Sequence, residues 1–302
     1  MKELVIISGK GGTGKTSVTG SFAALARNAV LADCDVDAAD LHLLLDPKVR
    51  EEHDFYSGHE AIIRTADCTG CGLCAELCRF DAVRQGRQDA CDTYRRRPAC
   101  PAPFFIDPFA CEGCGVCVHF CPQKAIDFPD ALCGKWFVSK TRHGRMVHAR
   151  LGIAAENSGK LVTTVRQQAK QIAEALEAEW LLIDGPPGTG CPVIASITGA
   201  GAVLVVTEPT LSGEHDLLRV LHLTRHFKIS AFISVNKWDI NPDMTERIEG
   251  AAAEAGATVL ERIPYDTAIT QAQILGLSVV EQSNGPAATA IQTLWEKLCH
   301  HL

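Results

Sequence analysis

The segment Gly9–Ser17 constrains the fold of this chain more than any other feature. It reads Gly-Lys-Gly-Gly-Thr-Gly-Lys-Thr-Ser and fits the pattern G-x-x-x-x-G-K-[ST]. A short apolar run, Glu3–Ser8, precedes it, and helical periodicity over Thr16–Arg27 follows it. In this context glycines let backbone N–H groups close around phosphate oxygens at a helix N-terminus. The segment therefore predicts a phosphate-binding loop (P-loop) in an α/β domain; the alternative is a glycine-rich turn with a chance lysine.

The loop also predicts which side chains hold a nucleotide. Lys15 should reach the β- and γ-phosphates, and the Thr16 hydroxyl should ligate Mg²⁺. ATP or ADP with Mg²⁺ are the cofactors that suit this chemistry. The residues that we expect around the nucleotide are Gly9, Lys10, Gly11, Gly12, Thr13, Gly14, Lys15, Thr16 and Ser17.

Short apolar runs alternate with helical patterns along most of the chain. We expect further strands at Ala29–Asp33, Trp180–Asp184, Ala202–Glu208, Ile229–Asn236 and Val259–Ile263. We expect a hairpin over residues 135–151, a helix beginning at Ser158, and helices at Gly213–His226, Pro242–Ala255 and Pro286–Cys299. This alternation predicts an α/β fold with a doubly wound, mostly parallel sheet covered on both faces.

The chain has 14 cysteines, and ten of them lie between Cys68 and Cys121. Eight form two runs with the spacing C-x₂-C-x₂-C-x₃-C, which is that of bacterial two-cluster ferredoxins. There, the first three thiolates of a run bind one cluster and the fourth binds the other, so we predict two [4Fe–4S] clusters. The predicted ligands are Cys68, Cys71, Cys74 and Cys121 for one cluster, and Cys111, Cys114, Cys117 and Cys78 for the other. Two zinc sites are the alternative.

The cysteine segment interrupts the α/β pattern and so predicts a discontinuous organisation. Residues 1–60 and 131–302 would form a P-loop ATPase domain, and residues 61–130 an inserted, small α+β ferredoxin-like domain. Cys91, Cys100 and the basic run Arg95–Arg97 lie between the two cysteine runs. We expect spectator thiols and a solvated loop there, with docking of an acidic partner as the alternative role of the arginines.

Lys10 makes the loop resemble the deviant Walker A motif of the MinD/ParA/Mrp/nitrogenase-iron-protein class of P-loop ATPases. The resemblance implies ATP hydrolysis in an ATP-bound dimer, in which Lys10 crosses to the partner's nucleotide. Asp33-Cys34-Asp35 matches switch I of the class, which implies Asp33 near Mg²⁺ and Asp35 near the attacking water. The implied catalytic residues are therefore Lys10, Lys15 and Asp35.

Later segments extend the resemblance over residues 150–302. Asp184 ends a strand that resembles Walker B, which implies a place on the water shell of the magnesium. Gly185–Gly190 resembles switch II of the Mrp-type iron–sulfur carriers. The resemblance further implies that Asn236 contacts the adenine and that Asp266 lies in a loop flanking the base.

Three functions remain open at this point. The first is a slow, Mg-dependent ATPase that couples nucleotide-dependent dimerisation to electron transfer or metallocluster maturation on a partner protein, as a homodimer or a heterodimer with a paralogue. The second is an iron–sulfur or metal cluster carrier. Mrp-type carriers hold a transferable cluster with a Cys-x₂-Cys pair in their C-terminal half, whereas this chain has no such pair after Cys121. The third is a MinD-type positioning ATPase. Membrane cycling would need a basic amphipathic last helix, whereas Ile291, Leu294 and Leu298 predict a core helix.

Composition narrows the partners. The net charge of −7, from 29 basic and 36 acidic residues, argues against binding nucleic acid. Leu4–Ile7 is too short for the apolar core of a signal peptide, and no apolar stretch reaches the length of a membrane span. We therefore expect a cytoplasmic protein without a direct membrane anchor, whose reduced thiols bind metal.

Cys191 lies seven residues after Asp184. In the nitrogenase iron protein, the cysteine at this offset ligates a cluster shared by two subunits. Cys133 is the candidate for the second thiolate that such a bridging site needs. The alternative is that Cys191 is a small buried residue that packs the following helix.

Overall fold

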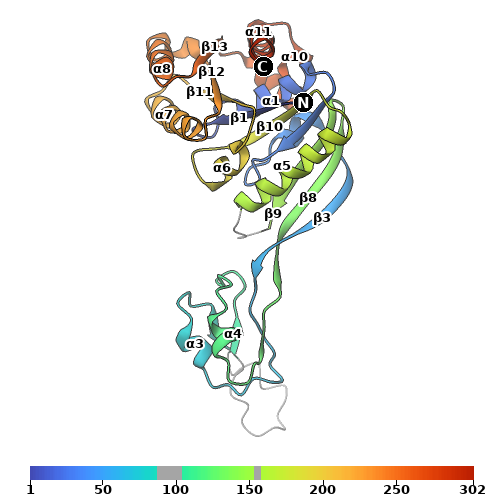
Figure 1. The fold of residues 1–302 in the computed structure, drawn as a ribbon, viewed down its shortest axis with the longest axis vertical. Coiled ribbons are helices and arrows are strands. Elements are labelled where there is room, and N and C mark those ends of the chain that lie inside the picture. Colours follow the sequence, from blue (N-terminus) through green and yellow to red (C-terminus); the bar gives the residue numbers. More distant parts are fainter. Residues whose placement is uncertain (87–103, 153–157) are drawn as a thin grey trace. The chain divides into compact units, whose positions relative to one another are not determined.

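A computed structural model describes residues 1–86, 104–152 and 158–302 (Figure 1). These residues form two compact units. The P-loop unit comprises Met1–Asp54, Gly134–Leu151 and residues 158–302, and the cysteine unit comprises Phe55–Cys133 with Gly152. The divisions at 54/55 and 133/134 fall inside two long strands, a few residues from the predicted domain boundaries at 60/61 and 130/131.

A nine-stranded sheet is the framework of the P-loop unit, in the order β13-β12-β11-β1-β10-β2-β9-β8-β3. Neighbours from β13 to β9 pair in parallel, and β8 pairs antiparallel with β9. The predicted mostly parallel α/β sheet is therefore confirmed. The strands are β1 (Lys2–Ser8), β2 (Ala29–Asp33), β3 (Lys48–His59), β8 (Asp130–Thr141), β9 (Gly144–Leu151), β10 (Trp180–Pro187), β11 (Ala202–Thr207), β12 (Ser230–Asn236) and β13 (Thr258–Ile263).

Helices cover both faces of this sheet (Figure 1). On one face, Leu4 and Ile6 of β1 belong to a core that includes Phe22 and Trp295. The alternate residue Val5 is also fully buried, because helices pack on the opposite face too. The helices are α1 (Lys15–Leu25), α2 (Leu41–Leu45), α5 (Ser158–Ala175), α6 (Cys191–Ile197), α7 (Leu211–His226), α8 (Pro242–Glu254), α9 (Thr267–Ile274), α10 (Val279–Gln282) and α11 (Pro286–His301).

The last helix, α11, packs into the core as predicted. Ile291, Leu294 and Leu298 are fully buried, and Trp295 lies against Phe22 with ring centroids 4.9 Å apart. Across residues 1–86, 104–152 and 158–302, no helix combines the length and apolar character that crossing a bilayer requires.

Strand β3 is an element that the sequence did not predict. Its residues alternate little between apolar and polar, and most of them are exposed. The predicted hairpin over 135–151 is present as β8 and β9, and β3 lies beside β8 at the edge of the sheet. Pairing along β8 therefore forms this strand, because its own hydrophobic pattern is too weak to do so.

The cysteine unit contains two copies of one small motif. Each copy has a five-residue helix, α3 (Leu73–Leu77) or α4 (Val116–Phe120), after a glycine with positive φ. Two two-stranded sheets accompany them: β4 (Ile62–Ile63) with β7 (Ile126–Asp127), and β5 (Val83–Gln85) with β6 (Phe104–Ile106).

The turn that follows each helix repeats at the level of single residues. Asp81 and Lys124 both adopt positive φ, at 51° and 50°. The next residues, Ala82 and Ala125, are both buried, and each carbonyl accepts a backbone hydrogen bond of 2.8 Å. The two cysteine runs thus fold as equivalent halves.

Candidate functional site

The P-loop connects β1 to α1, and two of its glycines are required by their surroundings. Gly14 has a φ of 91°, and a Cβ atom there would collide with the amide nitrogen of Asn236. At Gly9, a Cβ atom would collide with Asp216 of α7. Both positions therefore exclude a side chain, since α7 and the end of β12 approach the loop closely.

Lys15 is the centre of a buried ionic network. Its ammonium lies 2.9 Å from an oxygen of Asp184 and 3.4 Å from an oxygen of Asp35. The Thr16 hydroxyl donates to the other Asp184 oxygen at 2.8 Å, and Thr19 donates to the same oxygen as Lys15 at 2.9 Å. Parallel pairing of β1 with β10 and of β10 with β2 brings these groups to one edge of the sheet. The structure thus brings Lys15, Thr16, Asp35 and Asp184 together.

Asp33 completes an excess of negative charge in this network. Both Asp33 and Asp184 are fully buried, and burial together with the Asp184 carboxylate raises the pKa of Asp33 well above its ordinary value. One Asp33 oxygen accepts from the Asp35 N–H at 3.2 Å, and the other has no hydrogen-bond partner among the described residues. Burial alone would lower the pKa of Lys15, but Asp184 and Asp35 raise it, so the lysine is charged. Because one ammonium cannot balance three carboxylates, a bound cation could neutralise the remaining negative charge.

A cavity of about 430 Å³ opens beside this network. Its volume lies in the range of small-ligand and cofactor sites. The P-loop from Gly11 to Ser17 forms one side, and the far wall comes from α2 with the residues before it and from α9. The residues of that wall are Ala38, Asp40, Leu43, Leu44 and Gln273.

Lys10 lies outside this cavity, among residues of its own chain. Its ammonium lies 3.4 Å from Glu208 and 3.3 Å from the hydroxyls of Thr210 and Ser212. Lys237 pairs with the other oxygen of Glu208 at 2.5 Å. The predicted crossing lysine is therefore half-exposed and held at the start of α7.

Asn236 and Asp266 make contacts that the sequence did not predict. The Asn236 amide donates to the carbonyl of Thr13 at 2.8 Å, and its oxygen accepts from the Lys237 N–H at 3.0 Å. Asp266 caps α9 by accepting from the Ala268 N–H at 2.8 Å. Neither residue lines the cavity of the P-loop, and their contact with a base stays a prediction.

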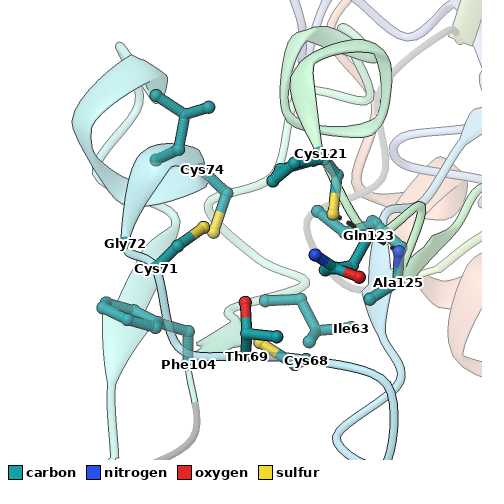
Figure 2. A pocket seen from close by; sticks show the side chains of 13 residues that line it. Ile63, Cys68, Thr69, Cys71, Gly72, Cys74, Phe104, Cys121, Gln123 and Ala125 are labelled. Carbon is teal, nitrogen blue, oxygen red and sulfur yellow. Dashed lines mark hydrogen bonds between the residues drawn. The ribbon is translucent and has the colours of Figure 1, made fainter.

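The eight predicted cluster ligands line two pockets of the cysteine unit. Figure 2 shows the first pocket, with its cysteine side chains surrounding a space bordered by Phe104 and Ile63. The cysteines of the first pocket are Cys68, Cys71, Cys74 and Cys121. Those of the second are Cys78, Cys111, Cys114 and Cys117. Each pocket thus takes three cysteines from one run and the fourth from the other, which are the two groupings predicted from the sequence.

The surroundings of these cysteines act on the ionisation of their thiols in two opposite ways. The Ala125 N–H donates to the sulfur of Cys121 at 3.3 Å, a contact drawn in Figure 2. Burial raises the pKa of the Cys74 and Cys117 thiols, so an adjacent cation would be needed to keep them ionised. Among the described residues, no three or more His, Cys, Asp or Glu side chains converge on a single metal-ion position.

Five of the six remaining cysteines are buried, exposed or outside the described residues, and the sixth, Cys299, is half-buried. Cys133 is buried and donates to the Ser57 carbonyl at 3.0 Å. Cys34 is fully buried, and this burial together with Asp33 raises the pKa of its thiol. Cys191 is exposed at the start of α6, so the alternative of a small buried packing residue is wrong. Cys91 and Cys100, with Arg95–Arg97, lie outside the described residues.

Three residues around the P-loop were missed by the sequence analysis. Thr19 holds Asp184, Gln273 donates to the Ser17 hydroxyl at 2.9 Å, and Arg142 binds the carbonyl of Leu44. Thr19 could have been found, since it is a polar residue on the buried face of a helix, four positions after Lys15. Gln273 and Arg142 lie far away in the sequence and carry no local signal.

The fold and the network around Lys15 define a P-loop nucleotide-binding protein. The CobQ/CobB/MinD/ParA nucleotide binding domain family matches residues 4–279, and the chain belongs to this family.

Solved structures with this fold include cell-division ATPases. MinD of Pyrococcus furiosus has a TM-score of 0.57 and 18% identity, with coverage of 100% of this chain and 99% of the other. MinD of Pyrococcus horikoshii complexed with Mg-ADP has a TM-score of 0.56 and 17% identity, with coverage of 98% and 95%.

Curated relatives are of two kinds. An uncharacterised protein of Methanocaldococcus jannaschii is 30% identical over 98% of this chain and 96% of its own length. An iron–sulfur cluster carrier protein of Pyrococcus furiosus is 27% identical, but the match covers only 48% of this chain and 53% of the carrier.

Proposed function

We propose that this protein is an ATP-hydrolysing iron–sulfur protein. Nucleotide-dependent dimerisation would be coupled to electron transfer or metallocluster maturation on a partner protein. One observation carries the proposal: each of two pockets is lined by four cysteines, three from one run and one from the other. Eight cysteines in two interleaved sets are the ligands that two [4Fe–4S] clusters need.

The pockets fit clusters in more than their cysteine count. Gly72 and Gly115 adopt positive φ before the third cysteine of each run, which turns the chain around the pocket. The lining is otherwise mostly apolar, and the Ala125 N–H bonded to Cys121 would stabilise a thiolate. When bound, the two clusters would supply one-electron transfer.

The P-loop site supports the ATPase half of the proposal. Lys15 and the P-loop amides would hold the phosphates, and Thr16, Asp33 and Asp184 would hold Mg²⁺ with its water shell. The buried oxygen of Asp33 that has no partner in the described part of the chain supports a cation at this position. Asp35 would orient the attacking water. Lys10 would leave Glu208 and cross to the nucleotide of a second chain.

Two other functions have support of their own. The partial match to an iron–sulfur cluster carrier favours cluster delivery. Four protein thiolates for each cluster would favour keeping the cluster over giving it to another protein. Electron transfer is therefore our first proposal. The likeness to MinD favours a positioning ATPase, but it concerns the fold alone.

Metal analysis of anaerobically purified protein tests the iron–sulfur proposal. We expect about eight irons and eight sulfides per chain. Cys121→Ala should impair the cluster in the pocket of Cys68, and Cys78→Ala the cluster in the pocket of Cys111. The reason is that each pocket takes its fourth cysteine from the other run. Cys133→Ala is the matched control and should keep full iron. Stoichiometric zinc in place of iron would refute the proposal.

Sedimentation of Asp35→Ala with ATP tests the dimer. Loss of the residue at the attacking water should preserve ATP binding and trap a dimer. Two relatives of this chain, 30% and 24% identical, occur in one organism, so a heterodimer with a paralogue is the second arrangement to test. A variant that stays monomeric with ATP, alone and with its paralogue, would contradict the coupling. Transfer of iron to an apo-acceptor without reduction would favour the carrier.

A further inference from the structure

The tip of the β8–β9 hairpin reaches the wall of the P-loop cavity. Arg142 lies in this tip, between the two strands, and its side chain is about one-third exposed. Its guanidinium donates to the Leu44 carbonyl at 2.5 Å and to the Gly276 carbonyl at 3.0 Å. One side chain thus joins three segments that are far apart in the sequence.

Two of these segments build the far wall of the cavity. Leu44 belongs to the last turn of α2, and Leu43 and Leu44 both line the cavity. Gly276 follows α9, whose Gln273 lines the cavity and donates to the Ser17 hydroxyl. Carbonyls at the end of a helix lack partners within the helix, so Arg142 supplies the partner that Leu44 needs.

The guanidinium is itself held in place. Glu281 of α10 accepts from Arg142 at 2.7 and 2.9 Å, one bond to each carboxylate oxygen. Ser278 and His143 also bind this carboxylate, at 2.7 and 2.8 Å. Burial alone would raise the pKa of Glu281, but the hydrogen bonds from Arg142 and Ser278 lower it far below its ordinary value. The guanidinium nitrogen Nη2, which completes this bidentate pair, is also the donor to the carbonyls of Leu44 and Gly276, so the pair fixes where that nitrogen lies.

We propose that Arg142 is a positioning residue for the nucleotide, which fixes α2 and the end of α9 at the far wall of the P-loop cavity. Because Arg142 belongs to the β8–β9 hairpin, a nucleotide that stabilises this wall would also stabilise the hairpin. The inference rests on nucleotide binding at the P-loop, within the proposed function, but not on the presence of clusters. Strand β8 begins at Asp130, so the hairpin is also the segment that continues into the cysteine unit.

Titration of the full-length protein with ADP and Mg²⁺ tests this role. Arg142→Ala should weaken ADP binding about tenfold, since the charge-assisted hydrogen bonding that Nη2 shares between the two wall carbonyls is lost. Arg142→Lys keeps the charge but loses the fork and should fall between. Arg150→Ala removes an exposed arginine from the same hairpin and should bind as the wild type does. Glu281→Gln should weaken binding less than Arg142→Ala, and it serves if Arg142→Ala fails to fold.

Hydrogen exchange separates positioning from a purely structural contribution. In the wild type, ADP should protect the amides of residues 141–147, and in Arg142→Ala this protection should disappear while the P-loop amides stay protected. Unchanged ADP affinity together with unchanged hairpin protection in Arg142→Ala and Glu281→Gln would overturn the inference. A wild-type protein that binds ADP but no iron would refute the proposed function and leave this result standing, whereas one that binds no ADP would overturn both.

Discussion

The P-loop unit and the cysteine unit hold their sites in different ways. In the P-loop unit, Asp33 ends the buried strand β2, Asp184 lies in the buried strand β10 and Lys15 begins α1. The helices α1 and α11 share one apolar core. In the cysteine unit, neither α3 nor α4 has a single buried residue. The core of the cysteine unit is small and includes Ala61, Ala82, Ala125 and Ile126.

This difference shows which interactions stabilise each site. Burial of apolar surface stabilises the P-loop unit without any ligand, so its network can stay partly unsatisfied in the absence of the proposed nucleotide and Mg²⁺. The cysteine unit buries too little apolar surface to be stabilised in the same way. Metal binding would therefore contribute directly to its folding free energy.

Removal of iron should produce the largest contrast between the units. Chelation under reducing, anaerobic conditions should abolish protection from hydrogen exchange in the described parts of residues 61–130, since the proposed clusters would supply the cross-links of this unit. The amides of β1, β10 and β11 should keep their protection, and ADP should still bind. A cysteine unit that stays protected without metal would break the comparison.

Lys10→Ala should have the next largest effect, on the rate of hydrolysis. A positive charge supplied across a dimer interface stabilises transition-state charge, and its loss should slow ATP turnover by about 10³-fold. ATP binding should persist, because Lys10 lies outside the cavity. Lys237→Ala is the control, since both lysines pair with Glu208. If both variants lost turnover equally, the effect would come from the lost ion pair with Glu208 and not from a lysine that reaches the partner's nucleotide.

Lys15→Ala should act on affinity. The substitution removes the ammonium that faces the phosphates, and ATP should bind roughly 100-fold more weakly, as for other truncated charge pairs. It also leaves the carboxylates of Asp35 and Asp184 without their buried cation, so the apo protein should unfold at a lower temperature. Titration calorimetry and thermal unfolding measure the two effects, with the exposed Lys160→Ala as control. If Lys15→Ala bound ATP with wild-type affinity, the P-loop would not be the nucleotide-binding site.

His148 should give the smallest effect, a pH dependence confined to the P-loop unit. Burial lowers the pKa of this histidine from 6.5 to about 4, and its ring bonds the Ser139 hydroxyl at 2.8 Å. The unfolded chain takes up a proton below pH 6.5 while the folded one does not, so stability falls as the pH drops from 6.5 to about 4. We expect a loss of about 3 kcal/mol by pH 4.

His148→Gln should flatten this part of the pH profile. Unfolding followed by the fluorescence of Trp180 and Trp295 measures it, since both side chains lie in the core of the P-loop unit. An equally steep profile in the variant would show that another group causes the loss.

Patterns within short segments predicted much of the fold. The runs at Glu3–Ser8 and Ala29–Asp33 are strands within one residue of the predicted bounds, because buried parallel strands are apolar throughout. Strand β3 was missed, since Lys48–His59 is mostly exposed and has no such pattern. Its partner β8 decides that it is a strand.

The cysteine spacing and the P-loop were determined by the sequence itself. A C-x₂-C-x₂-C run and a G-x-x-x-x-G-K-[ST] loop each place their functional atoms by local backbone geometry, so the residue types alone identify them. Only the tertiary structure decided that Cys191 is exposed, that Lys10 lies against Glu208, and that Arg142 joins α2 to the turn after α9. These contacts join segments that are distant in the chain, and their geometry depends on how whole strands and helices pack together. A hydrogen bond across such a distance leaves no periodicity in the sequence.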